Sequence, residues 1–197
     1  VVHLKCSMVN KMPGYKVDKY ANLRAGYTYM FGHAGKKLLF MGQEFAQERE
    51  WSEERELDWF LLAEELNRGM QEYVKELLAI YRKYPCMYEN DNNWFGFEWL
   101  NSDDKDRSTY SFCRKSEDGK NNLLFVINLT PMKWEDYKIG VPKKKKYRLL
   151  LNSDDKRFGG NGGEIPAAVM AVKGECNYQK YNISFDLPPY TAAIFVF

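Results

Sequence analysis

One glutamate and two tryptophans are the residues with the clearest chemical potential, and they lie in a polar, irregular stretch between residues 43 and 59. Glu44 comes just after the apolar run at residues 38–41, and Trp51 and Trp59 follow in the same stretch. Aromatic rings stack on the apolar faces of sugars, so the sequence predicts Glu44, Trp51 and Trp59 as substrate-binding residues. Each also has a structural interpretation, in which the carboxylate hydrogen-bonds to loop backbone and the tryptophans are buried and brace the loop.

Metal and thiol chemistry have little support in the sequence. The two histidines, His3 and His33, have no partner at metal-ligand spacing, so we predict neither a metal site nor a cofactor. His33 follows the end of a predicted helix, where we expect it to interact with the last carbonyls. The 4 cysteines form no CxxC pair, which favours reduced thiols in a cytoplasmic protein. These cysteines are Cys6, Cys86, Cys113 and Cys176.

Charge and hydropathy argue against two classes of partner. The 29 Lys and Arg residues against 27 Asp and Glu give a formal net charge of +2, too balanced for nucleic acid or an anionic membrane. The densest basic run, at residues 143–146, is interpreted as a solvated hairpin turn. No apolar run approaches the ~20 residues of a membrane span, and the first residues lack a signal-peptide layout. We expect a soluble cytoplasmic protein with no nucleic-acid and no membrane partner.

The elements that would position Glu44 are predicted as helix, strand and helix. Residues 20–31 and 70–81 repeat apolar side chains at three- and four-residue steps, which predicts two amphipathic helices. Residues 38–41 are apolar throughout, as is typical of a strand in a parallel sheet covered by helices. This order is the pattern of an α/β barrel, whose functional groups follow its strands. One unit cannot close a barrel, so residues 1–86 are interpreted as a terminal helix-strand-helix piece of a (β/α)8 barrel.

From residue 87 onward the pattern changes to short strands separated by turn signals. Apolar residues alternate at Tyr181, Ile183, Phe185 and Leu187, and the sequence ends on an apolar run at 193–197. About seven strands in ~100 residues are usual for a sandwich. Residues 87–197 are therefore predicted to be an all-β antiparallel sandwich domain, which makes the fold class of the chain α+β. We expect this part to fold independently and the N-terminal part to be less stable.

Ordered segments along the whole sequence match one family. The chain resembles the glycogen (1,4-alpha-glucan) branching enzymes of the alpha-amylase superfamily, and any one segment alone would be weak evidence. The segments include Val1-Val2-His3, Lys11-Met12-Pro13-Gly14, Gly35-Lys36-Lys37-Leu38-Leu39-Phe40-Met41-Gly42, Glu44-Phe45-Ala46-Gln47, Leu57-Asp58-Trp59, Gly96-Phe97-Glu98-Trp99, Asn128-Leu129-Thr130-Pro131 and Leu187-Pro188-Pro189.

The resemblance implies a three-domain glycosyltransferase of which this sequence is the C-terminal part, starting directly after the family's His-Asp-Glu motif. Such an enzyme transfers an alpha-1,4-glucan segment to a 6-hydroxyl and makes the alpha-1,6 branches of glycogen. Retaining transfer needs two carboxyl groups roughly 5 Å apart, and the family's catalytic residues would lie upstream of Val1. No catalytic residue is assigned here. We expect this part alone to be inactive, with alpha-glucan (glycogen or amylose) as the substrate of the whole enzyme.

Several residues keep more than one interpretation. The pairs Glu53-Glu54 and Asp154-Asp155 are interpreted as solvated loop charges, and the resemblance implies a supporting role for His3 beside the family's His-Asp pair. Two other functions stay open: a non-catalytic glucan-binding module, or part of another alpha-amylase superfamily glucan hydrolase. The alternating aromatics Phe95, Phe97 and Trp99 are interpreted as sandwich core, with surface glucan binding as the alternative.

The second predicted helix has an apolar stripe that needs a cover. The stripe consists of Met70, Tyr73, Val74, Leu77, Leu78 and Tyr81. Burying apolar area contributes roughly 25 cal/mol per Å2, so an uncovered stripe would cost several kcal/mol. We expect the stripe either to dock on the β domain or to pair with a second copy, which would be self-association of this chain.

Overall fold

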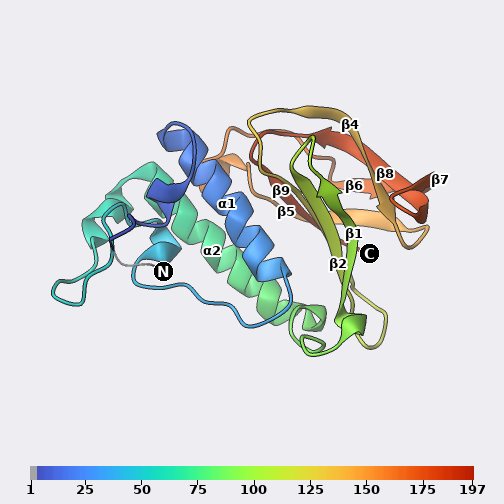
Figure 1. The fold of residues 1–197 in the computed structure, drawn as a ribbon, viewed down its shortest axis with the longest axis horizontal. Coiled ribbons are helices and arrows are strands. Elements are labelled where there is room, and N and C mark those ends of the chain that lie inside the picture. The colour runs from blue at the N-terminus through green and yellow to red at the C-terminus, as the bar shows by residue number, and fades with distance from the viewer. Residues whose placement is uncertain (1–3) are drawn as a thin grey trace.

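The computed structural model describes residues 4–197, and within them two α-helices precede nine strands (Figure 1). His3 lies outside the described residues. Across residues 4–197 no helix combines the length and the apolar composition that crossing a bilayer requires. The elements are α1 (Lys16–Gly32), α2 (Glu65–Lys83), β1 (Phe97–Asp104), β2 (Thr109–Arg114), β3 (Leu123–Asn128), β4 (Trp134–Val141), β5 (Lys146–Asn152), β6 (Ala168–Met170), β7 (Val172–Cys176), β8 (Gln179–Leu187) and β9 (Ala192–Val196).

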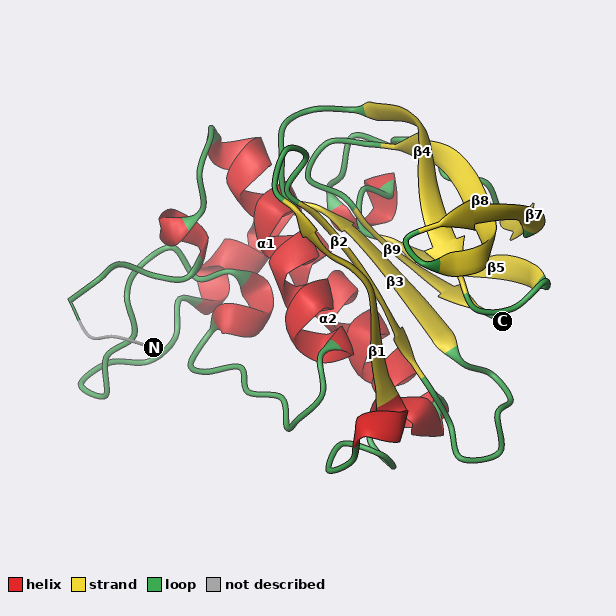
Figure 2. Ribbon diagram, turned by 45° about the vertical axis from the view of Figure 1, so that its right-hand side comes forward, coloured by secondary structure: helices red, strands yellow, loops and turns green. Residues whose placement is uncertain are grey.

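The strands form two antiparallel sheets, which confirms the prediction of an all-β antiparallel part. One sheet has the order β1-β2-β3-β9-β5-β6 and the other the order β4-β8-β7. The helices cover one face of the six-stranded sheet, and the three-stranded sheet lies on its other side (Figure 2). The lysines at 143–145 connect β4 to β5, which begins at Lys146, and so pass from one sheet to the other. They form a solvated turn, as predicted, but not a hairpin.

The central strands β3 and β9 are buried on both faces. Successive side chains of β3 point to opposite faces of the sheet. Leu123 and Phe125 pack against the helices, whereas Leu124 packs against the three-stranded sheet. Ile194 of β9 likewise packs toward the helices and Phe195 toward the small sheet. The helices and the six-stranded sheet therefore share one core. Independent folding of residues 87–197 stays a prediction, and without α1 and α2 one apolar face of that sheet would be open to water.

Both predicted helices are present, and the apolar stripe of α2 is covered within the chain. Met70, Tyr73, Val74 and Leu77 are buried in the core shared with α1 and the large sheet, whereas Leu78 stays exposed. Docking is thus the arrangement observed. The reason given for self-association, an uncovered stripe, no longer applies.

The predicted strand at residues 38–41 is not formed. Leu38 is 71% exposed, and the segment pairs with no strand among residues 4–197. Its backbone instead enters a turn, in which Gln43 N–H donates to the Phe40 carbonyl (3.2 Å) and the Gln43 side chain accepts from Phe40 N–H (3.1 Å). A strand needs a neighbour for its amides and carbonyls. With none in the described chain, apolar composition alone does not produce a strand.

A buried arginine joins α1 to the β part. Arg24 is 0% exposed; its Nε donates to the Ser153 carbonyl (2.6 Å) and its Nη1 to the Phe158 carbonyl (3.1 Å). Asp154, between those carbonyls, is also buried, and its carboxylate accepts the backbone N–H groups of Asn161 and Gly163 at 2.8 Å each. The interpretation of Asp154 as a solvated charge is therefore wrong: it folds the glycine-rich loop onto itself.

The same loop touches α2 so closely that only a glycine fits. A Cβ built on Gly69 would lie 2.6 Å from both the carbonyl carbon and the carbonyl oxygen of Phe158. Backbone atoms cannot rotate away as a side chain can. Gly69 therefore sets the distance between α2 and the loop that Arg24 holds from α1.

Two glycine substitutions should have opposite effects on stability. Gly69→Ala is expected to lower the free energy of unfolding by about 1–3 kcal/mol, because the loop must shift or strain. Gly26→Ala is the matched control, since nothing lies within 4 Å of a Cβ built on Gly26 in α1. It should raise stability by about 0.5–1 kcal/mol through helix propensity. Urea unfolding followed by circular dichroism measures both, and the same sign for both would contradict this packing.

Candidate functional site

The turn that carries Glu44 is held by both helices. It is a single 3-10 turn, η2 (Gln43–Phe45), flanked by residues in the left-handed conformation. Tyr27 of α1 donates its hydroxyl to the Gln43 carbonyl (2.9 Å) and Asn67 of α2 donates its amide to the Phe45 carbonyl (2.9 Å). Tyr27 and Asn67 are both buried, so these contacts are shielded from water. The position of the turn is therefore set by the packed helices.

The Glu44 carboxylate takes no part in holding this turn. It is half-buried, and among residues 4–197 it accepts no hydrogen bond and forms no ion pair. Burial, together with the nearby charge of Glu44, raises the pKa of Tyr27 well above its ordinary value. The structural interpretation, in which Glu44 hydrogen-bonds to loop backbone, is not supported. Its acceptor oxygens are available to a ligand.

Trp51 and Trp59 belong to the same loop but do not line one cavity. The Trp51 ring packs edge-on against Phe40 (centroids 5.3 Å apart), beside a crevice of about 20 Å3, room for little more than one water. The Trp59 ring packs on Phe45 (5.1 Å) and keeps about half of its surface exposed. Trp51 thus mainly braces the loop, and Trp59 presents a free face.

An ion pair that the sequence did not single out closes this loop. Arg49 donates to both carboxylate oxygens of Asp58, with 2.7 Å between Nε and Oδ2. The hydrogen bonds from Arg49 lower the pKa of the Asp58 carboxyl. Gln47 adds a further tie, because its side-chain oxygen accepts the Asp58 backbone N–H (2.8 Å). Arg49 and Asp58 are nine residues apart in an irregular loop, where no helix or strand spacing predicts their contact. The pair is therefore identified only from the fold.

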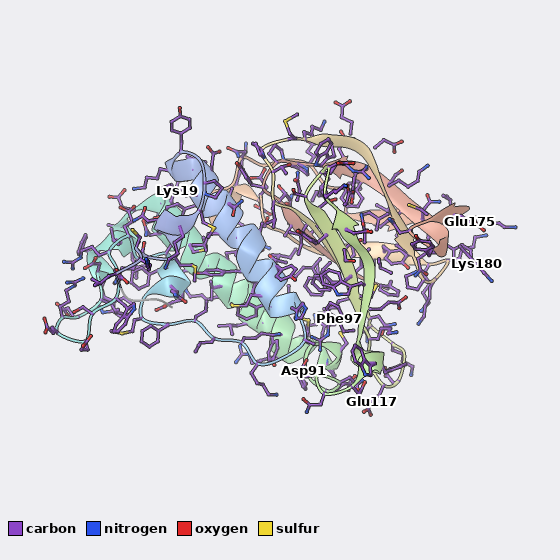
Figure 3. All side chains as sticks on the ribbon, in the orientation of Figure 1. Lys19, Asp91, Phe97, Glu117, Glu175 and Lys180 are labelled. Atoms are coloured by element: carbon purple, nitrogen blue, oxygen red, sulfur yellow. The ribbon has the colours of Figure 1, made fainter. Side chains whose placement is uncertain are left out.

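A second site, an aromatic hollow, lies where the C-terminal ends of α1 and α2 meet the start of β1. Figure 3 shows Asp91 and Phe97 at this end of the molecule. The hollow has a volume of about 650 Å3. Trp94 is 97% exposed and Trp99 is 38% exposed. Its lining consists of His33, Ala34, Asp91, Asn92, Asn93, Trp94, Phe97 and Trp99.

Polar contacts fix the segment that carries Trp94. The Asn93 side chain accepts the N–H groups of Phe95 (2.9 Å) and Gly96 (3.2 Å), which caps the short turn η5 (Trp94–Gly96). Asp91 accepts from Arg114 of β2 at 2.6 Å, and both side chains are almost fully buried. Trp94 is thereby presented to solvent by an anchored backbone.

The aromatic residues of this region divide into core and surface. Phe97 packs on Phe112 (5.0 Å, stacked) on the helix side of the large sheet, not between the sheets as predicted. Phe95 and Trp99 are exposed. Trp94 was not predicted as a binding residue from the sequence. Its position directly after Asn93, which caps a turn, would have indicated an exposed side chain, because it lies outside the alternating run. Exposed indole faces beside amide and carboxylate groups suit a ligand with apolar faces and hydroxyl edges.

His33 ends α1 through its backbone rather than its ring. Its N–H donates to the Tyr29 carbonyl (2.9 Å), and its ring packs against Phe97 with centroids 4.9 Å apart. The expected contact with the last helical carbonyl is thus made by the main chain. Lys37 donates to the His33 carbonyl and lies 5.9 Å from the Tyr81 ring. Burial, and then the charge of Arg114, lowers the pKa of Lys37 to about 8.

Comparison with known proteins finds relatives that match the helical part and the β part of the chain together. Residues 99–197 match the family model of the alpha amylase C-terminal all-beta domain. The chain is 66% identical over 197 residues to the 1,4-alpha-glucan branching enzyme GlgB of Butyrivibrio fibrisolvens, covering 100% of this chain and 31% of that protein. It is 44% identical over 189 residues to GlgB of Aquifex aeolicus, covering 96% and 30%. The chain therefore spans less than a third of the length of these relatives.

Solved structures share the fold at low sequence identity. Isomaltulose synthase from Klebsiella sp. LX3 superimposes with a TM-score of 0.58 at 12% identity, over 89% of this chain and 38% of that one. AmyP in complex with maltose gives a TM-score of 0.59 at 13% identity, over 90% and 35%. At such identities the likeness concerns the fold alone.

The depressed pKa of Lys37 should make stability depend on pH. The folded state binds this proton less tightly than the unfolded state, so between about pH 8 and the unfolded value near 10.4 the unfolded state binds more protons. Stability should therefore rise with pH in that window. Urea unfolding of the wild type and of Lys37→Met at pH 7, 9 and 10.5 isolates the effect. As pH rises, the free energy of unfolding of the wild type should increase relative to that of the variant. A constant difference would mean that Lys37 does not titrate there.

Proposed function

The chain belongs to the family of the alpha amylase C-terminal all-beta domain and is related along its whole length to 1,4-alpha-glucan branching enzymes, and from this we propose that it is the C-terminal part of such an enzyme. The complete enzyme transfers an alpha-1,4-glucan segment to a 6-hydroxyl and forms alpha-1,6 branches in glycogen biosynthesis. The observation that carries the proposal is the 66% identity over all 197 residues, which extends through the helical part and not only the β part.

Within that enzyme, residues 1–86 form the end of the catalytic (β/α)8 barrel and residues 87–197 the C-terminal all-β domain. Support comes from exposed apolar side chains of the helical part, among them Leu38, Phe60 and Leu78. A barrel would supply neighbouring strands for residues 38–41 and cover for these side chains. The unformed strand is then a segment whose pairing partners lie on the rest of the barrel.

Glu44 and Trp59, with Trp51 as support, contact the glucan at the barrel mouth. Three features favour this: Glu44 has unused acceptor oxygens, Trp59 has a free face, and the turn that carries Glu44 is fixed to α1 and α2. The aromatic hollow at Trp94 and Trp99 supplies a second glucan contact on the surface. The catalytic carboxylates belong to the rest of the enzyme, and no residue of this chain is assigned to bond cleavage.

The compartment we propose is the cytoplasm. The four cysteines are free, and Cys86 and Cys113 are buried thiols whose pKa burial raises. Unpaired thiols that contribute to a core suit a reducing compartment.

A chimera tests the branching function directly. This chain should replace the corresponding 31% of the Butyrivibrio fibrisolvens relative. The chimera is expected to branch amylose, seen as a fall in iodine staining without new reducing ends. The control is the same protein ending before the replaced segment, which should be inactive. A folded chimera that hydrolyses amylose, and does not branch it, would favour a glucan hydrolase instead.

The chain alone should not catalyse branching or hydrolysis. Retaining transfer requires a nucleophilic carboxylate and an acid about 5 Å apart in a fixed site, and neither is assigned to this chain. Iodine staining and reducing-end assays on the purified chain check this. Turnover that scales with protein and tracks it through purification would contradict the assignment of catalysis to the remainder of the enzyme.

The aromatic hollow should bind maltoheptaose weakly. Trp94→Ala and Trp99→Ala are each expected to weaken binding about three- to tenfold, because a stacked ring contributes roughly 0.5–1.5 kcal/mol. Tyr15→Ala is the matched control: Tyr15 is an exposed aromatic at the opposite end of α1, about 25 Å away for 17 residues. Affinity is measured by chemical-shift titration. Equal losses in all three variants would argue against a localised site.

A further inference from the structure

A basic hollow lies between the end of α2 and the start of β5, apart from the residues assigned above to glucan contact. It has a volume of about 500 Å3 and includes Lys83, Lys146 and Arg148. Lys146 and Arg148 are two residues apart on β5, so they lie on the same face of the strand. The remaining lining is Tyr84, Leu149, Leu150, Ala167, Ala168 and Val196, with no carboxylate.

The charges of this hollow are not neutralised by the fold. Among residues 4–197, Lys83, Lys146 and Arg148 form no ion pair, although ten ion pairs occur elsewhere. Lys83 also closes the last turn of α2, where a cation offsets the helix dipole, and its ammonium lies 5.6 Å from the Tyr84 ring. Lys146 and Arg148 have no such structural duty. Neighbouring unpaired cations repel one another, so an anion would stabilise the group.

The lining indicates what kind of anion fits. Tyr84 is almost buried, and the positive charge of Arg148 counteracts the effect of burial on the pKa of Tyr84. Arg148 and Tyr84 thus line the same hollow close enough to interact, with apolar side chains completing the lining. A phosphate group carries close to two negative charges and accepts paired hydrogen bonds from arginine, while lysines add point charges. The apolar surface could take a small organic group, and the volume falls within the usual range for ligand pockets.

We propose that Lys83, Lys146 and Arg148 form a binding site for a phosphate group, either free phosphate or a small phosphate monoester such as a sugar phosphate. The site is separate from Glu44 and from the aromatic hollow, and it does not depend on the proposed branching function. The two further lysines of the β4–β5 turn, Lys144 and Lys145, raise the local positive potential without lining the hollow.

Titration of the full chain with three probes tests the site at physiological salt, where diffuse surface charge is screened. The probes are inorganic phosphate, glucose 6-phosphate and glucose, followed by chemical shifts or calorimetry. Saturable binding of a phosphate probe, with no binding of glucose in this hollow, is expected. Tighter binding of glucose 6-phosphate than of inorganic phosphate assigns the site to a monoester, and equal affinity assigns it to the phosphate group itself. Failure of both to saturate overturns the proposal.

Charge-matched variants separate a site from general attraction. The double variant Lys146→Gln with Arg148→Gln should weaken phosphate binding at least about tenfold, since it removes charge-assisted hydrogen bonds. Lys144→Gln with Lys145→Gln removes the same charge nearby and should change affinity less than about twofold. Equal losses in both, or displacement of phosphate by chloride or duplex DNA at similar charge concentration, would overturn the site. Should the first variant misfold by circular dichroism, Lys83→Gln, at the exposed end of α2, replaces it under the same criteria.

Discussion

The contact on which the arrangement of this molecule depends is the buried guanidinium of Arg24. Taking a charged group out of water is costly, and the cost is offset only where hydrogen-bond acceptors meet it. The acceptors here are the carbonyls of Ser153 and Phe158, on a loop that the Asp154 carboxylate holds in shape. Because the arginine comes from α1 and the loop abuts Gly69 of α2, one loop fixes the position of both helices.

The two candidate glucan sites both draw on these two helices. Tyr27 and Asn67 hold the turn of Glu44, and the end of α1 contributes His33 to the aromatic hollow. Neither site is built from the sheets alone. A carboxylate on a turn anchored at both ends loses little freedom when a ligand arrives, so the ordering cost is met during folding. The shared core therefore links the all-β part to the turn of Glu44, and it brings the end of α1 to the aromatic hollow.

The sequence predicted those elements whose side-chain periodicity is regular and whose partners lie in the chain. Both helices and strands such as β3, β8 and β9 have that property. Strand β4 escaped prediction because a bulge between Trp134 and Tyr137, with Asp136 at a φ of 45°, breaks its alternation. Residues 38–41 failed for the opposite reason, since their composition is that of a strand but the described chain offers no neighbour. Composition shows that a segment is able to form a strand, but strand formation also requires a neighbouring strand to pair with.

The candidate sites were predictable only in part, for the same physical reason. Glu44, Trp51 and Trp59 were proposed because they follow an apolar run, and the fold gives them different surroundings. Asp154 looked like a solvated charge because burial of a carboxylate depends on the two amides that approach it from the glycine-rich loop. The aromatic hollow at Trp94 and the basic hollow are each built from segments far apart in sequence, and no local pattern predicts either of them.

The place of β9 in the large sheet constrains when this chain can fold. β9 follows every other strand in the sequence, yet it lies between β3 and β5 and carries apolar side chains into both cores. On the ribosome, β1, β2 and β3 therefore emerge as half a sheet whose inner edge stays unpaired, with β5 and β6 unable to join them. The helices can form early, since their contacts are local, but the layer they cover is completed only when residues 192–196 leave the exit tunnel. Until then the nascent chain presents a long apolar edge. A chaperone would be needed most at this stage, before β9 has emerged.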